Sequence, residues 1–279
     1  MPQQQVTTAS QALRQHWFLY VYEGVELALF MLSACLGAVV LYAATSPVPA
    51  ELPNTTLRGL AMGAAMGLTA VLIIHSPMGK RSGAHFNPAI TLTYLRLGRI
   101  APWDAAFYLV GQFVGGIAGV ALATLLLGQQ LALPPVRYVI TVPGSYGTAA
   151  AFGAEFLMAS VLMFAVLWTS NRKRFARLTS YLIGVLITFY VLLFGPVSGF
   201  SINPARTVGS ACFAHVWTAL WLYFTAPLLG MFAAAQLYIA LYGKQHVRCA
   251  KLHHTPSYLC RCNNAHSTDS EEIISRSKA

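Results

Sequence analysis

The chain has 279 residues, of which 56% are hydrophobic and only 9% are charged. A soluble domain carries about 25% charged residues, so this composition excludes an ordinary soluble fold and indicates a membrane protein. The formal net charge is +10, but the cations lie in short polar segments between apolar runs, which argues against nucleic-acid binding and is typical of membrane topology.

Six apolar stretches are long enough to cross a membrane, since a helix needs about 20 apolar residues to span the hydrocarbon core. They lie at about 17–42, 57–76, 102–127, 148–170, 178–197 and 216–242. We therefore predict an all-α membrane protein in three parts. A polar N-terminal segment covers 1–15, a membrane domain covers 16–243 and a polar C-terminal tail covers 244–279.

The basic residues between these stretches predict the orientation, because lysine and arginine are enriched in cytoplasmic loops. If the N-terminus is inside, two connections on that side carry most of the loop cations. These are Lys80, Arg81, Arg96, Arg99, Arg172, Lys173, Arg174 and Arg177. Arg58, Arg137 and Arg206 remain for the outer half. We expect both termini to be cytoplasmic and the protein to lie in the inner or plasma membrane of the cell.

Two further apolar segments, 85–97 and 202–213, are too short to span. Each lies in a repeated sequence. Residues 82–91 read Ser-Gly-Ala-His-Phe-Asn-Pro-Ala-Ile-Thr, and residues 198–207 read Ser-Gly-Phe-Ser-Ile-Asn-Pro-Ala-Arg-Thr, with six of ten positions identical. This similarity indicates that the two short segments are equivalent parts of an internal repeat.

The repeat divides the membrane domain into halves at about 16–128 and 148–243. Each half has three spanning stretches and one short segment. Because three is an odd number of crossings, the second half enters the membrane with the opposite orientation. The result is an inverted repeat, in which paired short segments mark the binding or permeation site.

Each short segment contains Asn-Pro-Ala. The two copies are Asn87-Pro88-Ala89 and Asn203-Pro204-Ala205. Asparagine is a favoured helix N-cap and proline is favoured at the first helical position, so both copies predict the start of a helix that crosses half the bilayer. The two helix N-termini should meet near the midplane, each with about half a positive charge. Together with the two asparagine amides they would accept a water oxygen and repel a cation.

These motifs resemble those of the major intrinsic protein family, the aquaporins and aquaglyceroporins, over about residues 17–243. The resemblance implies the aquaporin fold, with six transmembrane helices and two re-entrant half-helices in a right-handed bundle. It also implies a homotetramer in the lipid bilayer, with one pore per subunit for small neutral permeants. A channel of this kind is not an enzyme and needs no cofactor.

Two carboxylates lie at equivalent places inside the apolar spans, where ionisable groups are costly and usually functional. Glu23 and Glu155 are near the start of the first helix of each half. The resemblance implies that each accepts hydrogen bonds from a re-entrant loop and braces it. A proton-coupled transporter that uses them as carriers is the alternative. Glu26, one turn from Glu23, receives no role.

Arg206 follows the second motif directly. A cation at this depth should line the pore, where it repels other cations and donates hydrogen bonds to a neutral permeant; an arginine that only braces the loop is the alternative. The resemblance implies that Gly67, Val191 and Phe200 complete the selectivity constriction. Because Gly67 has no side chain, we expect a wide constriction that passes water, glycerol, urea, boric acid or silicic acid.

Other positions favour a water-selective channel. Thr207 stands where glycerol channels of the family usually have aspartate, and Ala211 and the pair Tyr223–Phe224 also resemble the water type. The constriction acts directly on the permeant, so we give it more weight. A water-selective channel with little solute flux remains the alternative.

Two histidines help to distinguish a channel from an intramembrane enzyme. His85, just before Asn87, is expected to line the inner vestibule. An intramembrane enzyme would need a nucleophile beside a base, and His75, at the end of a span, has no such context. A structural junction protein would need a blocked pore, against which Gly67 argues.

The tail concentrates soft and imidazole side chains. They are Cys249, His253, His254, Cys260 and Cys262. Such ligands are compatible with a tetrahedral zinc site, although the spacing fits no standard zinc finger. We expect any such site to be structural or regulatory.

Overall fold

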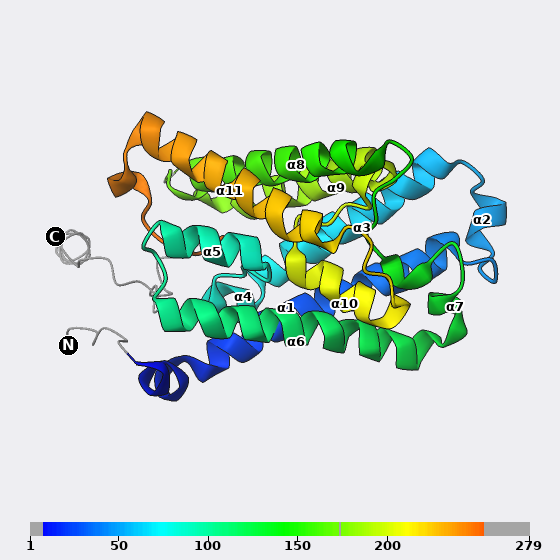
Figure 1. The fold of residues 1–279 in the computed structure, drawn as a ribbon, viewed down its shortest axis with the longest axis horizontal. Coiled ribbons are helices and arrows are strands. Elements are labelled where there is room, and N and C mark those ends of the chain that lie inside the picture. Colours follow the sequence, from blue (N-terminus) through cyan, green and yellow to red (C-terminus); the bar gives the residue numbers. More distant parts are fainter. Residues whose placement is uncertain (1–7, 173, 254–279) are drawn as a thin grey trace.

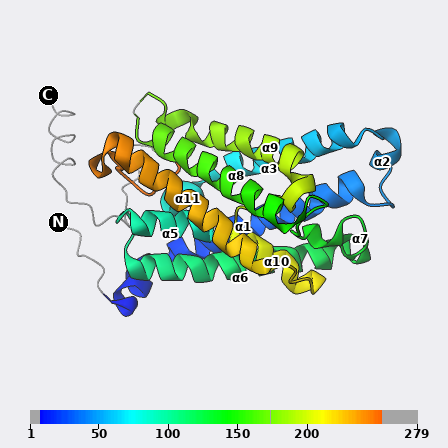
Figure 2. The ribbon, with the colours of Figure 1, turned by 45° about the horizontal axis from the view of Figure 1, so that its top comes forward.

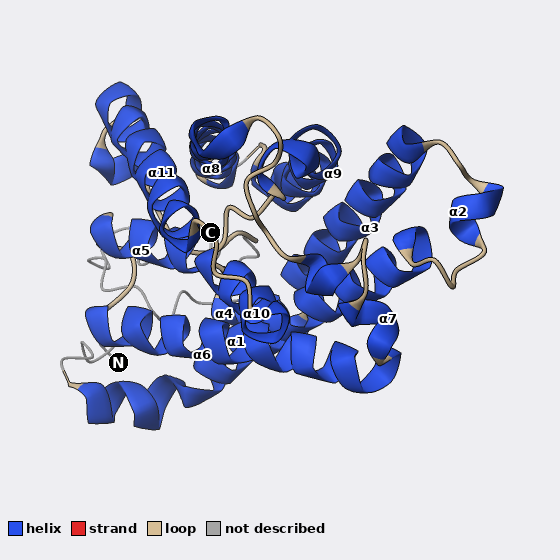
Figure 3. Cartoon of the chain, turned by 45° about the vertical axis from the view of Figure 1, so that its right-hand side comes forward, coloured by secondary structure: helices blue, strands red, loops and turns tan. Residues whose placement is uncertain are grey.

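Six long helices form the body of the protein in the computed structural model, which describes residues 8–172 and 174–253. They are α1 (Ala9–Tyr42), α3 (Thr55–His75), α6 (Pro102–Leu127), α8 (Gly147–Ser170), α9 (Thr179–Ser198) and α11 (Leu220–Tyr242). All six are long and apolar enough to cross a membrane. The six spans predicted from the sequence are confirmed, and all regular structure in the described part of the chain is helical (Figure 3).

Two short helices fill the middle of the bundle. They are α5 (Pro88–Arg96) and α10 (Pro204–Ala214), each with proline at its first position. At 1.5 Å per residue their 9 and 11 residues extend only about 14 and 17 Å, roughly half of the hydrocarbon core. Figure 1 shows α5 and α10 extending toward opposite ends of the bundle from a common centre.

The helix α1 begins eight residues before the predicted apolar stretch. Thr8 caps it, since its side chain accepts a hydrogen bond from the backbone N–H of Gln11 while the side chain of Gln11 bonds back to Thr8. The extra turns are also held by tertiary contacts: the His16 ring lies 2.9 Å from Asp104 of α6, and both side chains are buried. Hydrophobicity alone does not detect a helix extension made of polar residues.

The long helices pack as equivalent pairs in the two halves, α1 with α6 and α8 with α11, while α3 packs against α9 (Figure 2). The α1–α6 contact is close because it is made through glycine: a Cβ atom added to Gly115 would overlap the carbonyl oxygen of Gly24. Small residues allow this approach of helix backbones in membrane proteins.

Short elements complete the connections. They are α2 (Val48–Glu51), α4 (Pro77–Ser82), α7 (Gln129–Ala132) and the 3-10 turns η1 (Arg137–Val139), η2 (Ala176–Leu178) and η3 (Lys244–His246). The helices α2 and α7 lie at one end of the bundle (Figure 1). The first turn of α1, the last turn of α11 and η3 lie at the other, which we call the termini end.

Candidate functional site

The two Asn-Pro-Ala motifs meet through a crosswise pair of hydrogen bonds. The side-chain amide of Asn87 donates to the carbonyl of Ile202 at 2.8 Å, and that of Asn203 donates to the carbonyl of Phe86 at 2.7 Å. Each asparagine therefore binds the loop that precedes the other motif. The N-termini of α5 and α10 are held together at the centre of the bundle.

Each asparagine also caps its own helix. The side-chain oxygen of Asn87 accepts from the N–H of Ala89 at 2.9 Å. That of Asn203 accepts from the N–H groups of Ala205 and Arg206 at 3.1 and 3.2 Å. A primary amide has two N–H donors, and only one of them is used in the crosswise bond. The other is available to a permeant.

The loops before the two motifs have the same unusual backbone. The positive φ angles are at Gly83 (107°), Ala84 (56°) and Phe86 (30°) in the first loop and at Gly199 (76°), Phe200 (48°) and Ile202 (46°) in the second. These positions correspond one to one in the repeat. Positive φ is unfavourable for residues other than glycine, so surrounding contacts must hold both loops.

Glu23 of α1 holds the first loop. It is fully buried, and its two oxygens accept from the N–H groups of His85 at 2.9 Å and Phe86 at 2.7 Å. The amide of Gln112 in α6 donates to the same carboxylate at 2.7 Å. The strained loop and α6 therefore share one buried carboxylate.

Glu155 of α8 holds the second loop in the corresponding way. It is also fully buried, and it accepts from the N–H of Ser201 at 2.9 Å and from the N–H of Ile202. The hydroxyl of Ser198 donates to it at 2.7 Å. Because the loop donors satisfy both of its oxygens, the carboxylate is held by fixed backbone groups.

Serines and tyrosines to which sequence analysis gave no supporting role add a second layer of hydrogen bonds to the loops. Tyr108 donates to the carbonyl of Ser82 at 2.6 Å, and Tyr223 donates to the carbonyl of Ser198 at 2.7 Å. The Ser82 hydroxyl donates to Glu26 at 2.8 Å, which gives Glu26 the contact that sequence reasoning left unassigned. Ser82 and Ser198 are identical in the aligned repeat, and that identity was the available signal.

Arg206, in the first turn of α10, is only 9% exposed. Its Nη1 atom is buried and has no hydrogen-bond partner among the described residues. A buried charged donor that lacks a partner is costly in a dry interior. This arrangement fits an arginine that presents a donor to a permeant better than one that only braces the loop.

Gly67 of α3 lies against α9. A Cβ atom added there would overlap the carbonyl oxygen of Gly184 in α9 and come within 2.6 Å of the Thr188 hydroxyl. The missing side chain therefore allows the close packing of α3 on α9. Counting along the sequence from the motif gives a height on the helix, but it does not give the direction in which the residue points.

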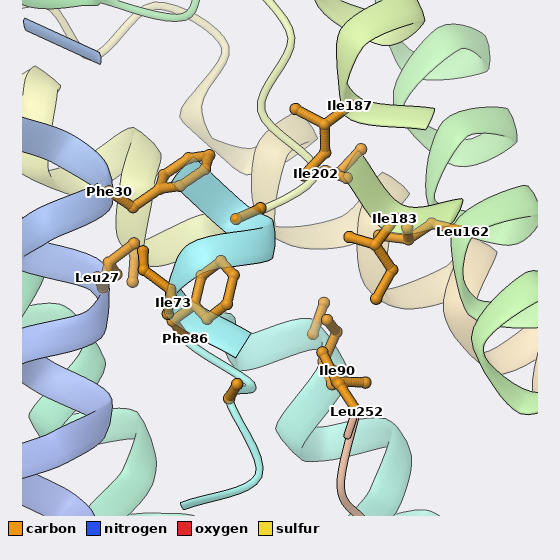
Figure 4. Close-up of a cluster of buried hydrophobic side chains, with 14 of the residues drawn as sticks. Leu27, Phe30, Ile73, Phe86, Ile90, Leu162, Ile183, Ile187, Ile202 and Leu252 are labelled. Atoms are coloured by element: carbon orange, nitrogen blue, oxygen red, sulfur yellow. The ribbon is translucent and has the colours of Figure 1, made fainter. Parts of the chain in front are cut away.

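The other two residues predicted for the constriction belong to the central apolar packing. Phe200 is 8% exposed, and its ring lies 6.1 Å from that of Tyr190, centroid to centroid. Val191 is partly buried against the same cluster. Figure 4 shows the apolar side chains that surround the two loops, with Phe86 and Ile202 among them.

A chain of hydroxyl groups ties the second loop to the connection between the halves. Thr207 lies 2.9 Å from Thr141 and 2.6 Å from Ser201, oxygen to oxygen. All three side chains are buried. Sequence analysis used Thr207 only as a marker of permeant type, and it missed Thr141.

His85 is 1% exposed and stacks on Tyr94. Its Nδ1 atom lies 3.0 Å from the Thr91 hydroxyl, and its Nε2 atom lies 2.5 Å from the carbonyl oxygen of Ala250 in the tail. The ring is thus fully engaged between α5 and the C-terminal segment.

Of the predicted zinc ligands, Cys249 and His253 lie in the described part of the chain, and His254, Cys260 and Cys262 lie outside it. Cys249 is disulfide-bonded, so its sulfur is not a thiolate ligand in this structure. The described residues contain no group of three or more histidine, cysteine, aspartate or glutamate side chains that could hold a metal.

Comparison with known proteins identifies the family. The model of the major intrinsic protein family matches residues 15–238. A probable NIP-type aquaporin of Nicotiana alata is 37% identical over 175 residues, 62% of each chain. Aquaporin Z of Rhodopseudomonas palustris is 30% identical over 202 residues, 70% of this chain and 84% of the relative. The chain thus aligns with a little over three fifths of the first of these relatives.

A solved structure gives the fold independently. The aquaglyceroporin of Plasmodium falciparum superposes with a TM-score of 0.66 at 20% identity, over 80% of this chain and 95% of that one. The inverted pair of half-helices, the family match and this superposition agree. The chain has the aquaporin fold, is an integral multi-pass membrane protein and belongs to the major intrinsic protein family.

Proposed function

We propose that the protein is a passive channel for water and small uncharged solutes that excludes protons and ions, and not an enzyme. The crosswise bonds between Asn87 and Ile202 and between Asn203 and Phe86 carry this proposal. They hold two positive helix ends and two asparagine amides at one point. A neutral permeant can accept hydrogen bonds there, whereas a cation meets about half a positive charge from each helix.

Arg206 supplies the second barrier in this proposal. Its buried Nη1 donor without a partner among the described residues would bind the oxygen of a permeant and repel cations. Protons would be excluded by the same positive field.

Which solutes pass besides water is a separate proposal. We propose glycerol, urea, boric acid or silicic acid, on the expectation that Val191 and Phe200 form an apolar wall of the constriction. A water-selective channel is the second candidate, and the structure adds an observation in its favour: Gly67, the residue expected to widen the constriction, is turned to α9.

We further propose a homotetramer with one pore per subunit and a cytoplasmic termini end. The orientation rests on the basic connections. Lys80 and Arg81 belong to α4, and Arg99 follows α5 at the same end of the bundle.

Stopped-flow light scattering of proteoliposomes tests the function. Shrinkage in a sucrose gradient measures water permeability, and re-swelling after shrinkage in a glycerol or urea gradient measures solute permeability. Water flux above that of empty vesicles with no solute flux would select the water-specific candidate. The absence of both fluxes from correctly inserted protein would refute a channel.

A further inference from the structure

The segment that follows α11 folds back into the termini end of the bundle. After η3 the chain becomes buried: Val247 is 0% exposed, Ala250 7% and Leu252 1%. Chain that leaves the last transmembrane helix of a membrane protein would ordinarily be solvated. Most of residues 247–253 are instead buried in the domain, although Arg248 is exposed, and we call this segment the C-terminal strap.

The strap is bonded to the loop that precedes the first Asn-Pro-Ala motif. The N–H of Leu252 donates to the carbonyl of Gly83 at 3.0 Å, and the His85 ring donates through Nε2 to the carbonyl of Ala250 at 2.5 Å. These are residues of the strained loop that Glu23 holds. The strap and the glutamate therefore bind different groups of the same loop.

Its other anchors come from both halves of the repeat. The N–H of Arg248 donates to the side chain of Asn171, at the end of α8, at 2.7 Å. The ring of His253 packs edge-on against that of His75, at the end of α3, with centroids 4.7 Å apart. The strap thus crosses the termini end from the second half to the first.

Leu252 is the part of the strap that enters most deeply. It belongs to the same buried apolar cluster as Ile90 and Ile183, and Figure 4 shows it beside Ile90. Ile90 is three residues after Asn87, in the first turn of α5. Leu252 therefore packs beside the first turn of α5, the half-helix that begins after Asn87.

We propose that the termini-side mouth of the channel is a peptide-binding site for the chain's own residues 247–253, and that the bound strap closes the mouth. The proposal rests on the channel function proposed above. The ligand is a short extended basic segment. It is recognised through the Gly83 and Lys80 carbonyls, the His85 ring and the Asn171 side chain, with an apolar pocket for one leucine.

Two opposing contributions act on the free energy of strap binding. Burial of Leu252 stabilises the bound form, because its apolar surface is removed from water. Against this, the Lys251 ammonium is only 7% exposed and donates to the carbonyl of Lys80 at 3.0 Å, and removing a charge from water is costly even when it is hydrogen-bonded. Release of the strap therefore loses the burial of Leu252 and regains the hydration of the Lys251 ammonium.

Full-length Leu252→Asp tests closure, because a carboxylate in the apolar pocket drives the strap out. If the strap is bound in about nine molecules of ten, release raises water permeability roughly tenfold. The matched control is Gln245→Asp, which places the same charge at an exposed position before the strap and should leave permeability unchanged. Leu252→Ala should give a smaller increase. Permeability of Leu252→Asp equal to or below that of the parent would overturn the proposal.

Hydrogen exchange measures strap binding without relying on flux. The amides of Arg248 and Leu252 should exchange slowly in the parent protein and fast in Leu252→Asp, whereas amides within α6 should be unchanged. Fast exchange of both strap amides in the parent would overturn the proposal. If the parent and the variants all lack flux while the parent amides are protected, the channel function fails and strap binding stands.

Discussion

Glu23 and Glu155 bind corresponding backbone N–H groups in the two halves, but only Glu155 also binds the serine of its own loop. Ser198 donates to Glu155 at 2.7 Å, whereas the equivalent Ser82 donates to Glu26 at 2.8 Å. The first half therefore uses two carboxylates where the second half uses one. Loss of the carboxylate should accordingly be most damaging at position 155.

Glu155→Gln should destabilise the second loop and abolish most water flux. Glutamine keeps the shape but replaces one acceptor oxygen with an NH2 group that faces N–H donors. Hydrogen bonds to a charged group contribute about 1.5–3 kcal/mol each, so we expect a loss of at least roughly 2 kcal/mol of stability. Thermal unfolding in detergent and stopped-flow permeability measure the two effects.

The control for this change is Glu51→Gln, at an exposed carboxylate in α2. It should alter neither the unfolding temperature nor the flux. Glu26→Gln should lie between the two, because Glu26 accepts from a single serine hydroxyl among the described residues. Equal stability of the variants at positions 155 and 51 would contradict the bracing role.

Much of the architecture can be predicted from the sequence, because a bilayer strongly restricts which segments can span it. Spans need long apolar runs, and the two Asn-Pro pairs fix the helix starts of α5 and α10 through local capping chemistry. Side-chain direction is not fixed in this way. Gly67 was placed at a pore by counting, yet its direction depends on how α3 rotates against α9, which is set by packing with Gly184 and Thr188.

The strap could not be predicted for a related reason. Residues 247–253 have no helical or strand periodicity, and their position is set by hydrogen bonds to distant residues such as Gly83 and Asn171. Pairings of this kind leave no local signal in one sequence. The repeat did contain a signal for Ser82 and Ser198, since both copies begin with Ser-Gly.

Gly67→Ala should destabilise the protein without acting as a filter mutation. The new methyl group would collide with the Gly184 carbonyl, and overpacking of this kind costs about 1–3 kcal/mol. Gly153→Ala is the matched control, because a Cβ atom there meets nothing within 4 Å, and alanine is favoured over glycine in a helix by about 1 kcal/mol. An unchanged unfolding temperature with selectively reduced solute flux would instead place Gly67 at the constriction.

Arg206→Gln should let cations and protons leak through the channel. A unit charge about 6 Å from the path contributes on the order of 3 kcal/mol at an effective dielectric constant of about 20, or roughly a hundredfold in ion flux. Arg137→Gln removes the same charge at an exposed position and should have no effect. Proton uptake by vesicles under a potassium diffusion potential measures the leak, and tight vesicles with Arg206→Gln would contradict the barrier role.

His253 predicts how the strap responds to pH. Burial, together with His75 and Lys80 nearby, lowers the pKa of His253 from its ordinary value of about 6.5. The bound strap therefore disfavours the protonated ring. The strap therefore has its full binding free energy above about pH 6.5. Binding weakens as the pH falls below this value, because the His253 ring takes up a proton more readily in the released strap than in the bound strap.

Water permeability of the full-length protein should consequently rise as the pH on the termini side falls from about 7.5 to 5.5, across the ordinary histidine pKa. The titratable groups near the His253 ring are His75 and Lys80 of α4. Tyr181 packs against His75. His253→Phe keeps a ring against His75 but cannot be protonated, so it should flatten the pH profile, whereas His246→Phe, at an exposed position, should retain it. An unaltered pH profile in His253→Phe would show that some other group senses the proton.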